Sequence, residues 1–301
     1  MRHEILIEMN LGANTILVLT GCALFGALAG SVGAFILARR RALISDVAGH
    51  AALPGIALGF LVGEALGLGG RSPLVLLTGA ALTAFLAAVL VPPLARLRRV
   101  GDDGAIATML AGFFGLGAVL FSLVQSHSSG AQGGLSKLFF GSAAAMTRAD
   151  LATLVTLSLV TLGVLLFCAR GFATVAFDED FARVSGVPVR RLDVALTAIL
   201  VATVVAGLQI AGVVLVVAFL LTPAVTARLV RGSLFRTASI AAILGAMAAC
   251  SGVLVSLLEE TIPTGSAMTL TSAVLFAVSL VLAARFSRSA RITIASEEAP
   301  R

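Results

Sequence analysis

Several residue types and motifs are missing from this sequence. It contains no tryptophan or tyrosine, and only 12% of its 301 residues are charged. Its single lysine, Lys137, lies between a serine and a leucine, so the Gly-Lys-Ser/Thr core of a phosphate-binding loop is absent. The three cysteines, Cys22, Cys168 and Cys250, are too far apart for a metal-binding or redox motif. A P-loop nucleotide site and a cysteine-based metal site are therefore excluded.

Polar stretches long enough for a soluble domain are also missing, because the longest connections have about 25 residues and domains usually need about 50. Instead, 59% of the residues are hydrophobic and the mean hydropathy is +1.08. Apolar segments of the length that spans a bilayer recur along the chain. The sequence therefore predicts an all-α, multi-pass membrane protein with about eight or nine spans. The predicted spans are residues 15–38, 42–63, 73–95, 104–124, 150–168, 192–208, 210–229, 236–257 and 266–285.

The arginines predict the orientation of the chain, because short cytoplasmic loops of membrane proteins are enriched in basic residues. Alternate connections carry most of them: Arg39, Arg40, Arg41, Arg96, Arg98, Arg99, Arg170, Arg183, Arg190, Arg191, Arg228, Arg231, Arg236, Arg285, Arg288, Arg291 and Arg301. The other side holds Arg2, Arg71, Lys137 and Arg148. We therefore expect the amino terminus outside and the carboxyl terminus in the cytoplasm. The net charge of +6 follows from this bias, so no nucleic-acid partner is expected.

The sixth and seventh segments are separated by only six residues, 207–212, so one broken helix is an alternative to two spans. The orientation favours two, since Asp193 and Arg228 can both be cytoplasmic only if the chain crosses twice between them. The whole chain, residues 1–301, is predicted to form one transmembrane domain. Within it we expect a cytoplasmic loop at 170–193 and a polar carboxyl-terminal tail at 286–301.

Asp46 and His50 form the one pair that could bind a metal ion from within a predicted span. Residues four apart lie on one face of a helix, about one turn from each other, so a carboxylate oxygen and an imidazole nitrogen would converge. Ionisable groups in a span usually face protein or a water-filled path. The alternatives are a capping or interhelical hydrogen bond for Asp46 and a satisfied buried imidazole for His50.

Pro54 is predicted to kink this helix, because proline cannot pair with the carbonyl group four residues earlier. With Gly49 and Gly55 it forms a candidate hinge, although an ordinary kink is an alternative. Thr222 and Pro223 are predicted to form a second kink, beside a path through the membrane.

The loop at 170–193 is predicted to contain a short helix that begins at Asp178 as its N-cap and stops near Gly186 and Pro188. Phe181 and Val184 share one face of that helix. This face could dock in a groove of a partner, or the segment could be a solvated connector. On the opposite side, His127, Glu259 and Glu260 are weaker candidates for contacts with metal or with another protein, and the alternative for each is an ordinary surface residue.

Four ordered motifs resemble the permease subunits of bacterial ATP-binding-cassette importers for manganese, zinc and iron. They are Asp46-x-x-x-His50-Ala51-x-Leu53-Pro54-Gly55, Leu138 to Ser142, the loop from Asp178 to Asp193, and Gly212 to Arg228. The resemblance covers about residues 12 to 286. Gly49 departs from the family, which commonly has serine there.

The resemblance implies a homodimer, two cytoplasmic ATPase subunits and an extracytoplasmic metal-binding protein at the bacterial cytoplasmic membrane. The chain would have no ATPase site and no cofactor of its own. Two copies of Asp46 and His50 would offer two oxygen and two nitrogen ligands, which suit Mn, Fe or Zn. The alternatives are a permease for a metal chelate, siderophore or vitamin, an ion-coupled secondary transporter, and a membrane-bound hydrolase. The sequence does not identify the metal.

Overall fold

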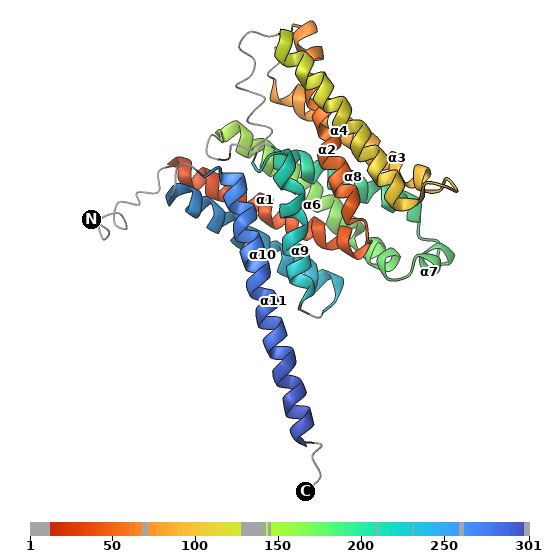
Figure 1. Ribbon diagram of the computed structural model, residues 1–301, viewed down its shortest axis with the longest axis vertical. Coiled ribbons are helices and arrows are strands. Elements are labelled where there is room, and N and C mark those ends of the chain that lie inside the picture. The colour runs from red at the N-terminus through yellow and green to blue at the C-terminus, as the bar shows by residue number, and fades with distance from the viewer. Residues whose placement is uncertain are drawn as a thin grey trace, which may run out of the picture.

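The computed structural model describes residues 13–67, 72–127, 143, 146–208, 210–230, 232–258 and 262–297 (Figure 1). Within these ranges the chain is helical and has no β-strand. The helices are α1 (Ala13–Ala38), α2 (Ala42–Ala65), α3 (Pro73–Ala95), α4 (Gly101–His127), α6 (Arg148–Phe177), α7 (Glu179–Val184), α8 (Val189–Leu208), α9 (Val213–Arg228), α10 (Leu234–Leu258) and α11 (Thr264–Glu297). Eight of these helices are long and apolar enough to cross a membrane. The predicted all-α, multi-pass fold is confirmed.

The sixth and seventh predicted segments form two separate helices. Helix α8 ends at Leu208, and α9 begins after Gly212, whose φ of 78° lies in the left-handed region that favours glycine. Helix α9 has 16 residues and is therefore about 24 Å long, less than the roughly 30 Å of a bilayer core. It is the one predicted span that falls short.

Two helices run beyond their predicted ends. Helix α6 continues past Arg170 to Phe177, because Ala169, Phe172 and Val175 keep its buried face apolar at helical spacing. The predicted cytoplasmic loop therefore shortens to residues 178–188. Helix α11 continues past residue 285 to Glu297, so most of the expected polar tail is helical. No glycine or proline stops that helix before Pro300.

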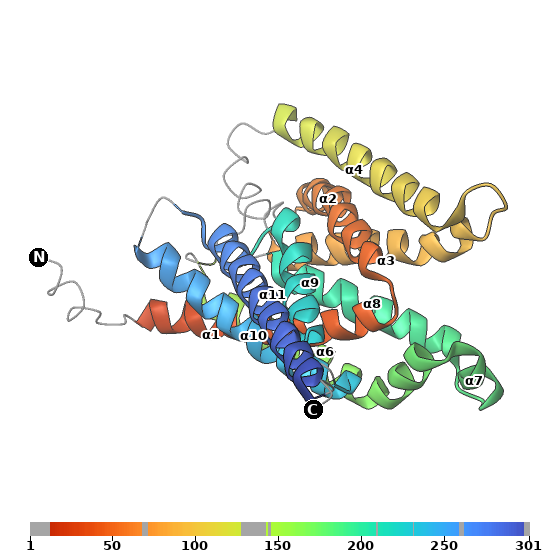
Figure 2. The same cartoon turned by 60° about the horizontal axis from the view of Figure 1, so that its bottom comes forward.

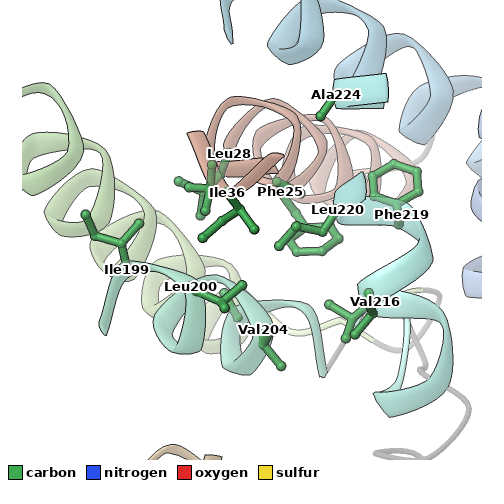
Figure 3. Packing of buried hydrophobic residues seen from close by; sticks show 14 of the residues in the cluster. Phe25, Leu28, Ile36, Ile199, Leu200, Val204, Val216, Phe219, Leu220 and Ala224 are labelled. Carbon is green, nitrogen blue, oxygen red and sulfur yellow. The ribbon is translucent and has the colours of Figure 1, made fainter. Parts of the chain in front are cut away.

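The main core surrounds α1, which packs against α6, α8, α9 and α10. In Figure 3, Phe25 and Ile36 of α1 point towards side chains of α8 and α9. The rings of Phe25 and Phe219 stack with their centroids 5.7 Å apart. This core holds together helices that are far apart in the sequence.

A second core joins α2 to α3, α4 and α8. Helices α2 and α3 cross closely at Gly55 and Gly79, where a Cβ on Gly55 would collide with the carbonyl oxygen of Gly79. Figure 2 shows α4 at the edge of the molecule, and little of α4 is buried. Helix α2 also contacts α9, so it lies between the two cores.

Candidate functional site

Asp46 and His50 lie in the first two turns of α2, which begins at Ala42. Their Oδ1 and Nε2 atoms are 3.5 Å apart, longer than an ordinary N–H···O hydrogen bond. An ion bound to both atoms at about 2.1 Å would see them at an angle of about 110°, close to tetrahedral. The two side chains are therefore placed as neighbouring ligands of one ion could be.

The burial of α2 singles out the same pair. Between residues 44 and 57, every residue except Asp46 and His50 is buried. The Asp46 side chain is 42% exposed and that of His50 is 25% exposed. The pair thus forms an opening in an otherwise enclosed stretch of helix, and this opening lies on the outside of the single chain.

Capping by Asp46 does not match these contacts. Asp46 is the fifth residue of α2 and so does not cap it. His50 packs edge-on against Phe114 of α4 with ring centroids 5.4 Å apart, and its buried Nδ1 has no hydrogen-bond partner among the described residues. The described residues contain no group of three or more His, Cys, Asp or Glu that could hold a metal. Metal binding by Asp46 and His50 stays a prediction, and one described chain supplies only these two ligands.

The candidate hinge residues follow on the same helix. Helix α2 continues through Pro54 from Ala42 to Ala65. The proline ring packs beside Gly117 of α4, where a Cβ would be 3.0 Å from Pro54 Cδ, and Gly55 lies at the close crossing with α3. Gly49 is buried. Close packing accounts for Gly55, and a kink or hinge at Pro54 stays a prediction.

Thr222 and Pro223 lie inside α9, a neighbour of α2. The Thr222 hydroxyl donates to the carbonyl of Ala218 at 2.7 Å, and Pro223 is buried. Ala218 and Val225, on the same face of α9 as Thr222, are exposed. Thr222 therefore belongs to an uncovered strip, as a pathway residue would, although its role stays a prediction.

Helix α7 has the ends that the sequence predicts. The Asp178 side chain accepts hydrogen bonds from the backbone N–H groups of Asp180 and Phe181 at 3.0 and 2.9 Å. At the other end Gly186 has a φ of 79°, which an L side chain adopts only with strain. The N-cap and stop signals are thus confirmed.

The outward face of α7 is apolar. Ala182 points inward and is fully buried, whereas Phe181 is 61% exposed and Val184 is 90% exposed. Phe177, at the end of α6, is 94% exposed. An apolar surface of this kind suits a protein partner, but the docking role predicted for these residues is untested by the structure.

The structure also reveals an ion cluster that the sequence reasoning missed. Arg39 and Arg41, in the turn between α1 and α2, bind Glu179 of α7 and Asp193 of α8. The charge pattern of the sequence marks Arg39 and Arg41 only as cytoplasmic residues. The signal that could have revealed the cluster is the presence of Glu179 and Asp193 at the two ends of a loop rich in arginine.

The outer-side candidates fall largely outside the described residues. His127 is the last residue of α4, and its side chain is not described. Glu259, Glu260 and the motif at residues 138–142 also lie outside the described residues. Their predicted roles are therefore untested.

The sequence of this chain matches a known family and several known proteins. The model of the ABC 3 transport family matches residues 13–283. The manganese transport system membrane protein MntC of Bacillus subtilis is 36% identical over 278 residues, or 92% of this chain, and the match spans 63% of that relative's length. The zinc transport system membrane protein TroC of Treponema pallidum is 33% identical over 265 residues, which are 88% of this chain and 87% of the relative.

Two solved structures share the fold. A chain of PsaBC from Streptococcus pneumoniae in complex with Fab is 27% identical with a TM-score of 0.78, and the match covers 93% of this chain and 95% of that one. An inward-facing conformation of a putative metal-chelate type ABC transporter is 22% identical with a TM-score of 0.65, covering 88% and 84% of the two chains. The helix arrangement described above is therefore shared with solved transporter structures.

Proposed function

This chain belongs to the ABC 3 transport family, and from that membership we propose that it is the transmembrane subunit of an ATP-driven importer of manganese, zinc or iron. The family resemblance predicted from the four motifs is thereby confirmed. The relatives named above are manganese and zinc transport proteins, which supports a divalent transition metal as the substrate.

The observation that carries the proposal is the opening in α2 at Asp46 and His50. An ionisable pair that faced lipid would be costly, so a protein surface is needed to cover it. A second copy related by a two-fold axis would bring the same patch of both chains together. The two half-sites would then offer two carboxylates and two imidazoles to one ion.

The Nε2 atom of His50, which lies 3.5 Å from Asp46 Oδ1, is the atom that would bind the ion, because Nδ1 is buried within the chain. Phe114 of α4 lies beside His50 and is exposed, so it would border the interface. Thr222 is half-buried on the adjacent α9 and would line the same path.

A site shared by two chains can be opened by moving them. When the two halves of the site separate or rotate, each ion loses ligands and its affinity falls. Binding and release then depend on the same movement, which ATP hydrolysis in another subunit would drive. Pro54, one turn after His50, is a candidate pivot for α2.

The remaining partners follow from the surfaces of the chain. A dimer of cytoplasmic ATPase subunits would dock on α7 through Phe181 and Val184, with Asp178 and Gly186 fixing the ends of that helix. An extracytoplasmic metal-binding protein would deliver the ion to the other side. The arginine distribution supports an amino terminus outside the bacterial cytoplasmic membrane.

Metal uptake by the purified complex tests the proposal. The chain is co-expressed with its ATPase, reconstituted in lipid vesicles and supplied with the metal-binding protein loaded with radioactive manganese, zinc or iron. Asp46→Ala and His50→Ala each remove one ligand atom from each copy, so uptake should fall about tenfold or more. Glu64→Gln removes a charge elsewhere on α2, at an exposed position near its other end, and should leave uptake unchanged.

The outcome separates the alternatives. Normal uptake in both ligand variants would remove Asp46 and His50 from the transport path. Uptake driven by an ion gradient without ATP would indicate a secondary transporter. Uptake of chelated metal, with none of the free ion, would indicate a chelate permease.

A further inference from the structure

Four side chains tie the start of α2 to helix α7. Arg39 is in the turn after α1, and its guanidinium donates to the Val175 carbonyl at 2.9 Å and to Glu179 at 3.2 and 3.3 Å. It also donates to Asp193 at 2.9 Å. Arg41 donates to the second carboxylate oxygen of Asp193 at 2.8 Å.

The Arg39 side chain lies at the centre of this cluster and is only 8% exposed. Its three partners belong to the end of α6, to α7 and to α8. Charge-assisted bonds from a planar guanidinium fix geometry as well as contributing energy. The turn between α1 and α2 is therefore held against the α6–α7–α8 connection at several points, while Nε of Arg39 has no partner among the described residues.

The cluster joins α7 to the turn before α2, in addition to the packing of both helices against α8. The backbone of α7 contacts α6 and α8, whereas α2 packs against α3, α4, α8 and α9. Arg41 directly precedes α2, and Asp46 follows it by five residues, about 7.5 Å along the helix axis. A shift of α7 would thus reach the first turns of α2 through Glu179, Arg39, Asp193 and Arg41.

We propose that Arg39 and Arg41, held by Glu179 and Asp193, are positioning residues that transmit movement of α7 to Asp46 and His50. The inference rests on the proposed function, because it assigns the movement of α7 to a bound ATPase. These side chains touch neither the metal nor nucleotide. They act by fixing the start of α2 to the helix on which the ATPase docks.

The number of metal ions transported per ATP hydrolysed distinguishes coupling from simple stabilisation. A purely structural cluster would affect the amount of folded complex, and hence uptake and ATPase rate in equal proportion. Loss of a coupling link instead lowers uptake while the assembled complex continues to hydrolyse ATP. Both rates are measured on purified, reconstituted complexes containing equal amounts of assembled protein.

Arg39→Gln and Asp193→Asn remove the charges that join the elements, and each should lower the metal-to-ATP ratio at least about fivefold, the low end of coupling between sites in proteins. Arg39→Lys keeps the charge without the planar fork and should lie between Arg39→Gln and the wild type. Arg40→Gln is the matched control, since Arg40 is exposed in the same turn and has no ion pair among the residues that the structure describes. Its ratio should equal that of the wild type.

An unchanged ratio in Arg39→Gln and Asp193→Asn, or an equal fall for Arg40→Gln, would overturn the inference. If the ratio is unchanged because uptake and ATPase rate fall in proportion, the cluster has a structural role only. If the wild-type complex itself transports no metal, the proposed function fails. This result is distinct from those that concern only the variants.

Discussion

Gly55 lies five residues after His50, and its neighbours explain it more directly than a hinge does. The residue touches the backbone of α3 at Gly79 without room for a Cβ. Small residues at helix crossings allow close packing in membranes, where hydrophobic burial contributes little between helices. The close crossing keeps α2, with its metal-binding candidates, against α3.

Gly55→Ala should therefore destabilise the isolated chain by about 1–3 kcal/mol, because the added methyl forces α2 and α3 apart. Unfolding in detergent, followed by circular dichroism, measures this effect. Gly163→Ala in α6 is the control, since a Cβ there meets nothing within 4 Å. It should be neutral or raise stability by up to about 1 kcal/mol. Equal effects of the two substitutions would contradict the packing explanation.

At the level of single residues, the sequence predicted that Asp46 and His50 lie close together, because residues four apart in a helix are on the same face. It could not predict that only these two side chains are open between residues 44 and 57, since burial depends on helices far away in the chain. For the same reason the partners of Arg39 were not foreseen. Its two charged partners, Glu179 and Asp193, lie 140 and 154 positions further on in the sequence.

Among the described helices, α7 has the form that the proposed contact with an ATPase needs. It has six residues, too few to be stable alone, so its cap at Asp178 and the buried Ala182 hold it in place. Its two large apolar side chains remain outside. A short, fixed helix of this kind presents them with little loss of conformational freedom when a partner binds.

Phe181→Ala should weaken association of the chain with its ATPase by about tenfold, because exposed aromatic residues often dominate an interface. Binding can be measured by biolayer interferometry with the chain in lipid nanodiscs. Phe167→Ala on α6 serves as the comparison, since Phe167 is 90% exposed but lies within a predicted span. Unaltered affinity for Phe181→Ala would move the docking surface away from α7.

The ends of α7 were predictable because capping is local: one side chain and one glycine determine them. The end of α6 was not. Arg170 suggested a membrane boundary, but a long side chain can reach water from a helix that continues. The extent of α11 was missed for a related reason, because polar composition alone does not end a helix.

The whole molecule brings together helices from opposite ends of the sequence. Helix α1 packs closely along α10, where Gly26 and Gly245 meet. The order and number of the helices could be predicted from hydropathy, because each span must satisfy its own backbone hydrogen bonds. Which helices touch could not, since many pairings bury similar apolar faces.

The orientation of the whole chain is testable with cysteine labelling. In a background without Cys22, Cys168 and Cys250, Arg98→Cys and Arg148→Cys place a thiol at exposed positions on opposite predicted sides. An impermeant maleimide should label Arg148→Cys in right-side-out vesicles and Arg98→Cys in inside-out vesicles. The reverse pattern would place the amino terminus in the cytoplasm.

The short length of helix α9 affects when it can pack fully during synthesis of the protein. With 16 residues it is too short to satisfy the usual length for a membrane span, and its connection to α8 is buried at Ile210 and Ala211. Much of its surface is covered by α1, α2, α10 and α11, two of which are synthesised after it. During translation α9 therefore acquires its full set of neighbours only after α10 and α11 have been inserted.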